Sequence, residues 1–385
     1  MQNKNNSEPK KSVQMAMISS QAFSLINFRG ALIEELNQRG VQVYAFASDY
    51  DEKSRLSIKA KGAIPLDYSL SRTGMNPIKD LIDLFRLSAQ LRRLKIDVTF
   101  AYFIKPVIYG TLAAWVAGVP KRYVMIEGAG YVFTESGTAT SWKRRMLRMI
   151  GQSLYRIGLS KAHRIFLLNP DDERLFVDEK MATRDKTVLL NGIGLDLAYF
   201  QAVPQAQQPV CFIMVARLLR EKGVFDFVDA ARLVKFRHPT TSFLLLGDVD
   251  LNPSSISESQ VQAWVDEGVL EWPGHVTDVR PWIAKANVFV LPSYREGLPR
   301  STQEAMAMGR PVITTDVPGC RETVQDGVNG LIVPVRDPNA LANAMISFID
   351  TPALIEKMGA ESRKMAVNQY DVHQINSLIL RCMDL

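Results

Sequence analysis

The chain has 385 residues, of which 47% are hydrophobic and 22% charged, and its formal net charge is +6. This length predicts two domains, and the composition is typical of a soluble globular protein. The sequence has no apolar run of the roughly 18 residues that a membrane-spanning helix needs. Its three cysteines lie far apart beside apolar residues, which favours reduced, packed thiols in a cytoplasmic protein over disulfides or a metal cluster.

The first half of the chain alternates short apolar runs with amphipathic stretches. Residues 1–12 are polar and carry lysines, which predicts a disordered tail and not a signal peptide. Residues 13–200 predict a first domain built from βα units, a pattern typical of a doubly wound parallel sheet. The expected strands are residues 13–18, 41–47, 96–101, 122–126 and 164–168, and the expected helices are residues 27–39, 77–94 and 107–117.

A basic amphipathic stretch closes this half, because no acidic residue occurs between Ser136 and Pro170. Its basic residues are Lys143, Arg144, Arg145, Arg148, Arg156, Lys161 and Arg164, and apolar residues lie between them. Such a stretch suits the surface of an anionic membrane. A half-buried helix with a solvated basic face is the alternative interpretation.

The second half restarts the alternation after residues 201–209, a Gln-, Ala- and Pro-rich segment that predicts a linker. Residues 210–368 predict a second Rossmann-like domain, and a cleft between two such domains is a usual place for a ligand. The expected strands are residues 210–215, 242–246, 270–272, 288–291, 312–315 and 330–333. The expected helices are residues 224–236, 257–267, 281–284, 338–348 and 353–369, with one more around Glu304.

Two cations follow the first strand of this second half. Arg217 comes directly after the strand, and Lys222 opens the next helix. A helix N-terminus with a guanidinium and an ammonium makes a good diphosphate site, and it can stabilise a departing diphosphate without a metal ion. The alternative is a pair of ordinary surface charges. Asp248 and Asp250 imitate a D-x-D metal motif, but we interpret them as solvated loop carboxylates and expect no metal.

Two glutamates eight positions apart, Glu296 and Glu304, flank a Gly-Leu-Pro loop after the expected strand 288–291. The carboxyl end of a parallel strand is where open α/β sheets bind ligands, and carboxylates accept hydrogen bonds from sugar and ribose hydroxyls. Residues 301–304 also fit a capping box, in which Glu304 bonds back to the backbone and binds no ligand.

This glutamate spacing resembles the E-x7-E signature of family 4 glycosyltransferases, and Arg217 and Lys222 match the R-x4-K arrangement with which that family holds the donor diphosphate. The resemblance implies a GT-B fold, in which two Rossmann-like doubly wound parallel-sheet domains face a cleft. It also implies a retaining enzyme with a UDP-sugar donor and no metal or other cofactor. In GT-B folds the last helix, here within residues 369–385, crosses back onto the first domain, although a plain terminal helix fits equally well.

The same resemblance assigns roles on the donor side. Arg217 and Lys222 would stabilise the leaving diphosphate, and Glu296 would orient the donor sugar. The further donor-binding residues that it implies are Gly274, His275 and Val276 at the base, Gly297 and Leu298 at the phosphate or sugar, and Glu304 at the ribose.

The acceptor half resembles the bacterial PglA-like subgroup, through Asn27-Phe28-Arg29, the Lys105 loop and the E-G-x-G run from Glu127. Members of that subgroup add a hexose or N-acetylhexosamine to an amino sugar on undecaprenyl diphosphate. The resemblance therefore implies that Lys105, Arg29 and Glu127 bind the acceptor and that Glu127 takes part in catalysis. Many relatives carry a histidine where Glu127 stands, and the first loop lacks the Gly-Gly that many family 4 members have.

Together these features predict a peripheral enzyme on the inner face of the cell membrane that forms an α linkage, with N-acetylgalactosamine the favoured sugar. We expect no nucleic acid partner. A UDP-N-acetylglucosamine 2-epimerase and a nucleotide-sugar-binding regulator without turnover are the alternatives. An NAD-dependent dehydrogenase is disfavoured because the first loop has no G-x-G-x-x-G.

Overall fold

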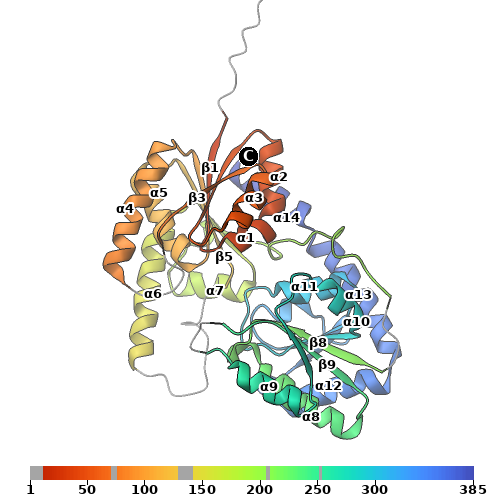
Figure 1. Cartoon of the computed structure of the whole chain (residues 1–385). Helices are drawn as coiled ribbons and strands as arrows, with labels where there is room; N and C mark the ends of the chain where they lie inside the picture. The colour runs from red at the N-terminus through yellow and green to blue at the C-terminus, as the bar shows by residue number, and fades with distance from the viewer. Residues whose placement is uncertain (1–11, 71–75, 129–141, 205–208, 251–253) are drawn as a thin grey trace, which may run out of the picture. The chain divides into compact units, whose positions relative to one another are not determined.

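The computed structural model describes residues 12–70, 76–128, 142–204, 209–250 and 254–385 (Figure 1). The chain divides into two compact parts, named here unit 1 and unit 2. Unit 1 comprises Met1–Leu167, Glu173–Leu189 and Asn376–Leu385, and unit 2 comprises Leu168–Asp172 and Leu190–Ile375. Of the expected tail and linker, residues 1–11 and 205–208 lie outside the described part of the chain.

Unit 1 is built on a seven-stranded parallel sheet with strand order β3-β2-β1-β4-β5-β6-β7. Its strands are β1 (Gln14–Ile18), β2 (Gln42–Ala47), β3 (Ala63–Asp67), β4 (Val98–Tyr102), β5 (Lys121–Ile126), β6 (Arg164–Leu167) and β7 (Thr187–Leu189). All five residues of β4 are buried, as expected for a central parallel strand that is covered on both faces. The chain extends from β1 to one side and from β4 to the other, so the strand order reverses between these two neighbours.

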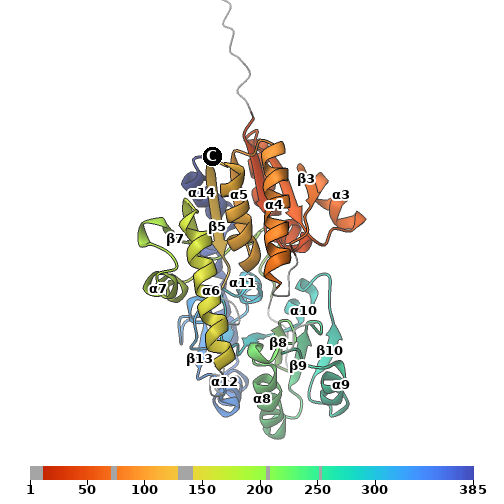
Figure 2. The same ribbon diagram turned by 90° about the vertical axis from the view of Figure 1, so that its left-hand side faces the viewer.

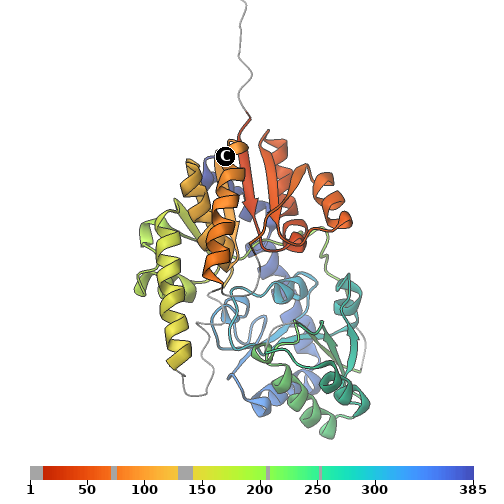
Figure 3. The same ribbon diagram turned by 60° about the vertical axis from the view of Figure 1, so that its left-hand side comes forward.

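Helices cover both faces of this sheet. They are α1 (Ala22–Asn27), α2 (Gly30–Gln38), α3 (Glu52–Ala60), α4 (Pro77–Arg93), α5 (Thr111–Ala117), α6 (Trp142–Ser160), part of α7 (Pro170–Asp178) and most of α14 (Val372–Met383). Helices α4, α5 and α6 lie side by side on one face (Figures 2 and 3), and α2 lies on the other (Figure 1). None of the helices described is both long and apolar enough to cross a bilayer.

The helix expected over residues 27–39 is interrupted in the structure. Helix α1 begins earlier and ends at Asn27, and α2 begins only at Gly30. The expected helix 107–117 opens as a π-helical turn, Pro106–Gly110, before α5. The prediction also missed β3, β7, α3 and α7, of which β7 is only three residues long.

Unit 2 is built on a six-stranded parallel sheet with strand order β10-β9-β8-β11-β12-β13. Its strands are β8 (Cys211–Val215), β9 (Ser242–Leu246), β10 (Glu271–Gly274), β11 (Val288–Leu291), β12 (Val312–Thr315) and β13 (Gly330–Val333). Its helices are α8 (Val224–Arg237), α9 (Glu258–Asp266), α10 (Arg280–Lys285), α11 (Arg300–Ala307), α12 (Pro338–Asp350) and α13 (Ala353–Gln369). The predicted doubly wound parallel sheets are therefore confirmed in both units.

The side chain of Arg310, which follows α11, is fully buried in unit 2. Its guanidinium donates hydrogen bonds to the carbonyl oxygens of Ile283 and Ala284 at 3.1 and 3.2 Å, and to those of Val203 and Pro204 at 3.4 and 3.0 Å. Burial lowers the pKa of Arg310 to about 10. This one side chain therefore fixes residues 203 and 204 to the end of α10.

We expect Arg310→Met to lower the free energy of unfolding of the protein by about 3 kcal/mol, because it leaves buried carbonyl oxygens without donors. Urea denaturation followed by circular dichroism measures this change. Arg237→Met is the matched control, since Arg237 is exposed on α8, and its effect should stay within about 0.5 kcal/mol. Equal effects of the two substitutions would contradict the role given to Arg310.

Candidate active site

The candidate donor site lies where the strand order of unit 2 reverses, between β8 and β11. Ligands of open α/β sheets bind outside the carboxyl ends of the strands at such a point. Here the loop after β8 carries Lys222 and the loop after β11 carries Glu296. The Lys222 ammonium donates to both carboxylate oxygens of Glu296, at 2.6 and 2.7 Å. The structure thus brings together two of the predicted site residues, 74 positions apart in the chain.

Gly223 allows the close approach of these two loops. Its φ is +73°, and a Cβ at this position would lie 2.0 Å from the carbonyl oxygen of Pro292. Any side chain at residue 223 would therefore separate the loops. Ser293 adds a further contact across the turn, because its hydroxyl donates to the Glu296 carboxylate at 2.7 Å.

The backbone around Glu296 is also fixed. The Glu296 N–H donates to the carbonyl oxygen of Pro318 at 3.0 Å. Gly319, with φ +78°, lies so close that an added Cβ would be 2.5 Å from the carbonyl oxygens of both Glu296 and Gly297. Among the described residues, none accepts a hydrogen bond from the N–H of Gly297 or Leu298. Gly297 is buried and Leu298 is half-buried, so both N–H groups lie within the loop without an acceptor in the described structure.

Sequence reasoning missed a buried group that supports this loop. The Asn169 side-chain amide donates to the carbonyl oxygen of Gly297 at 2.5 Å and to the Asp172 carboxylate at 2.9 Å. The guanidinium of Arg295 pairs with the same carboxylate, and the Asp172 side chain is fully buried. Burial raises the pKa of Asp172, and the nearby charge of Arg295 opposes that shift. The one available sequence signal was the position of Asn169, directly after an apolar strand.

Arg217, the second predicted cation, is held elsewhere in the described structure. Its side chain is 54% exposed, and its guanidinium pairs with Asp250 at 3.0 Å. No hydrogen bond or ion pair in the described ranges joins Arg217 to Lys222 or Glu296. Asp250, the second carboxylate of the D-x-D-like segment, is thus the ion-pair partner of Arg217. Residues 251–253, which follow it, lie outside the described residues.

Glu304 lies in the first turns of α11 and does not form the alternative capping box. The helix begins at Arg300, its N-cap is Pro299, and no side chain caps it. The Glu304 carboxylate instead accepts a hydrogen bond from Arg300 Nε at 2.9 Å. Burial raises the pKa of Glu304, Arg300 opposes this shift, and the negative charge of Asp278 adds to it.

The segment expected at the base follows β10. Gly274 adopts a φ of +76°, and its carbonyl oxygen accepts a hydrogen bond from Gly247 N–H at 3.1 Å. His275 is exposed, whereas Val276 packs against the core of unit 2. Asp278, in this segment, contributes its negative charge to the raised pKa of Glu304 on α11. Asp278 was not among the site residues predicted from the sequence.

The predicted acceptor residues lie in unit 1. Arg29 is fully buried, with its guanidinium paired to Glu127 and its centre 4.6 Å from the ring centroid of Tyr102. It also donates to the sulfur of Met125 at 2.9 Å. Arg29 is therefore placed to orient Glu127. A direct contact between Arg29 and a phosphate of the acceptor stays a prediction.

Lys105 lies in the loop after β4, and its ammonium pairs with Asp80 of α4 at 2.7 Å. Both side chains are largely buried, at 14% and 5% exposure. Burial, together with the nearby Asp80 charge, raises the pKa of Tyr109. Ala129 and Gly130, the second half of the E-G-x-G run, lie outside the described residues.

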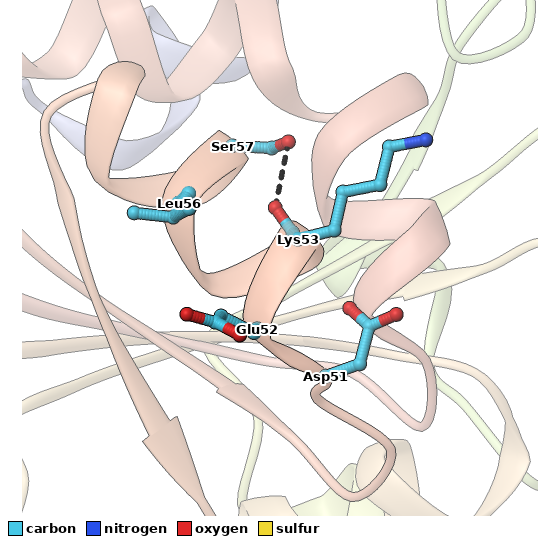
Figure 4. Close-up of a pocket in the computed structure, with 5 residues that line it drawn as sticks. All are labelled: Asp51, Glu52, Lys53, Leu56 and Ser57. Carbon is cyan, nitrogen blue, oxygen red and sulfur yellow. Dashed lines mark hydrogen bonds between the residues drawn. The ribbon is translucent and has the colours of Figure 1, made fainter.

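A separate hollow of about 560 Å³ lies beside α3 in unit 1 (Figure 4). It is lined by Asp51, Glu52, Lys53, Leu56 and Ser57, none of which is a predicted site residue. The Asp51 carboxylate accepts a hydrogen bond from Ser54 N–H at 2.7 Å and caps α3. This hollow is therefore a surface feature beside a capped helix, and we assign no binding role to it.

We expect Asp172→Asn to lower the free energy of unfolding by about 3 kcal/mol, because it removes one partner of a buried ion pair. Asp171→Asn is the matched control. The carboxylate of Asp171 pairs with Arg321, which is more exposed than Arg295. The Asp171→Asn substitution should therefore change the free energy of unfolding by less than about 1 kcal/mol. Urea denaturation of both variants measures the difference. A loss for Asp172→Asn no larger than that of the control would show that this group does not hold the loop.

Two family models match the chain. Residues 18–169 match the family model "Glycosyl transferase 4-like", and residues 209–351 match "Glycosyl transferases group 1". The chain is 26% identical to an N,N'-diacetylbacillosaminyl-diphospho-undecaprenol alpha-1,3-N-acetylgalactosaminyltransferase of Campylobacter jejuni, over 97% of this chain and 98% of that protein. It is 25% identical to a UDP-Gal:alpha-D-GlcNAc-diphosphoundecaprenol alpha-1,3-galactosyltransferase of Escherichia coli, over 77% of each chain.

Solved structures share the fold over the whole chain. A glycosyltransferase from Rickettsia africae superposes with a TM-score of 0.75 at 16% identity, covering 97% of this chain and 98% of that one. Anabaena HepE, solved in complex with UDP and glucose, superposes with a TM-score of 0.73 at 16% identity, covering 97% of this chain and 99% of that one. The chain therefore belongs to the group 1 glycosyltransferases of family 4 and has their GT-B fold.

Proposed function

We propose that this glycosyltransferase moves a hexose or N-acetylhexosamine, with N-acetylgalactosamine favoured, from a UDP-sugar to an amino sugar on undecaprenyl diphosphate. The new linkage would be α. The observation that carries the donor half is the Lys222–Glu296 pair at the reversal of strand order. Beside this pair, the N–H groups of Gly297 and Leu298 have no acceptor among the described residues. The acceptor class is supported by the activities for which the two relatives are named.

On the donor side, Lys222 binds the diphosphate, and Glu296 orients the sugar while it remains paired to that lysine. Arg217 leaves Asp250 and contacts the diphosphate, which is feasible because the side chain is half exposed. Glu304 accepts hydrogen bonds from the ribose hydroxyls, and the Gly274–Val276 segment contacts the base through its backbone.

In the proposed reaction, an acceptor hydroxyl attacks the anomeric carbon on the face from which the diphosphate leaves. The bond from that carbon to the UDP oxygen breaks, the new glycosidic bond forms, and the hydroxyl proton passes to the departing diphosphate. Negative charge grows on the diphosphate during this step, so Lys222 and Arg217 stabilise the transition state more than the ground state. Glu127, held by Arg29, and Lys105 bind the acceptor in unit 1.

An assay with a panel of UDP-sugars and a short-chain polyprenyl-diphosphate amino sugar tests this proposal, with products read by mass spectrometry. Transfer requires the acceptor, whereas an epimerase would convert the UDP-sugar without it. A regulator would give neither product. Absence of transfer from every UDP-sugar would refute the proposal.

Lys222→Ala should lower kcat at least ~100-fold while the protein remains folded, because it removes a preorganised cation from the leaving group. Steady-state kinetics and thermal denaturation check the two parts. Lys235→Ala is the control, because Lys235 lies on α8 and donates only to the carbonyl oxygen of Gly268 in the described structure. Near-normal kcat in Lys222→Ala would remove this lysine from the mechanism.

The raised pKa of Glu304 predicts a pH effect on UDP binding. Ribose hydroxyls donate to the ionised carboxylate, so affinity should fall as the pH is lowered through a folded-state pKa that lies above the ordinary value of about 4.3. In the ligand-free protein the raised pKa has the opposite effect on stability. Protonated Glu304 favours the folded state, so its contribution to the free energy of unfolding falls as the pH rises from the ordinary value through the folded-state pKa. Calorimetry with UDP should show this pH dependence in the native protein and its loss in Glu304→Gln. An unchanged pH profile in the variant would exclude Glu304 as the ribose ligand.

A further inference from the structure

Exposed apolar side chains gather on α4 and α6, two helices of unit 1. They are Ile78, Leu81, Ile82 and Phe85 on α4, and Trp142, Met146, Met149 and Ile150 on α6, each at least 45% exposed. We name this set the α4–α6 apolar surface. The spacing within α4 is i, i+3, i+4, i+7, which places its four members on one side of the helix. The spacing within α6 is i, i+4, i+7, i+8, with the same consequence.

Both helices already bury a different apolar side. Leu84, Leu87 and Leu91 of α4 lie in the core of unit 1, as do Tyr155 and Leu159 of α6. A surface helix of a globular protein usually has one apolar stripe, which faces the core. A second stripe that is left exposed marks a surface for another partner.

The charges beside this surface identify the partner. The two acidic residues of α4, Asp80 and Asp83, are buried, whereas Lys79 and Arg86 are exposed. Helix α6 has no acidic residue, and Arg145 is exposed near its start. The exposed side chains that the structure describes on the first halves of both helices are therefore apolar or cationic. This combination complements an anionic bilayer, where apolar groups enter the boundary of headgroups and acyl chains.

The surface also lies at a particular edge of unit 1. In parallel βα units the helices run antiparallel to the strands, so α4 and α6 begin at the carboxyl edge of the sheet. Figure 2 shows the two helices in one layer, on either side of α5. The loops that carry Lys105 and Glu127 leave β4 and β5 at the same edge, and Ile104 beside Lys105 is exposed as well.

We infer that the first halves of α4 and α6 form one docking surface for an anionic membrane, in which both apolar stripes insert into the bilayer. The role of α4 is the new element, because the sequence pointed only to the basic stretch of α6. The link to catalysis rests on the proposed function: a lipid-linked acceptor keeps its sugar at the bilayer surface, and docking would bring it to the edge that carries Lys105 and Glu127. The binding itself needs no assumption about the donor or acceptor sugar.

Co-sedimentation of the purified full chain with vesicles tests this inference. Vesicles of phosphatidylglycerol and phosphatidylethanolamine should bind the protein at least ~10-fold more strongly than vesicles of phosphatidylcholine, because cations and apolar groups act together. Binding should weaken with salt but not disappear, since apolar insertion is not screened.

The decisive variant is Leu81→Glu/Phe85→Glu on α4, with Met149→Glu as the corresponding change on α6. Each should reduce the vesicle partition coefficient at least ~10-fold. Phe236→Glu is the matched control, because Phe236 is 89% exposed on α8 of unit 2, and it should bind as the native protein does. Circular dichroism verifies that each variant is folded.

Native vesicle binding by the α4 variant would overturn the inference. The inference would also be overturned if the native protein did not bind vesicles but self-associated in analytical ultracentrifugation through the same side chains. The surface would then bind a second copy of the chain. Turnover with a detergent-soluble acceptor separates this inference from the proposed function. With that acceptor, every docking variant should keep the native kcat. If the native protein binds vesicles but transfers no sugar, the proposed function is refuted and the membrane-binding surface still stands.

Discussion

The ion pair between Lys222 and Glu296 is the contact on which the candidate donor site depends. It joins the loops after two adjacent strands, β8 and β11, at the point where the strand order of unit 2 reverses. Gly223 and Gly319 let neighbouring backbone approach these loops more closely than a side chain would permit. The cation and the carboxylate are thus fixed before any ligand arrives, which is the condition under which charges contribute most to catalysis.

In each unit a fully buried charged side chain holds an oppositely charged side chain that is only partly exposed. In unit 2, buried Asp172 holds Arg295 and Asn169, and Asn169 holds the carbonyl oxygen of Gly297. In unit 1, buried Arg29 holds Glu127. A buried charge without its partner is strongly unfavourable, so these pairs keep the outer groups in one orientation. The two units therefore use the same physical device on different side chains.

The regular elements of unit 2 could be predicted closely because they are short apolar runs with clear ends. The strands β9, β11, β12 and β13 have the predicted bounds. The three-residue β7 could not be found, because so short a run has no period. The Lys222–Glu296 neighbourhood was accessible because both residues follow strands at one sheet edge. By contrast, Asn169 and Asp172 meet residues 128 and 123 positions away, and no local pattern reports such a contact.

The predicted cations share one property that the sequence did not reveal: each already has a carboxylate partner. Lys222 pairs with Glu296, Arg217 with Asp250, Lys105 with Asp80 and Arg29 with Glu127. In the proposed donor complex Arg217 exchanges one anionic partner, Asp250, for another, so its net gain in the ground state is small. Lys222 keeps Glu296 in that complex and binds the diphosphate in addition. The gain increases when the diphosphate acquires charge on departure, whereas the charge of a carboxylate stays constant. Paired cations of this kind favour the transition state over the bound donor, which is what catalysis requires of them.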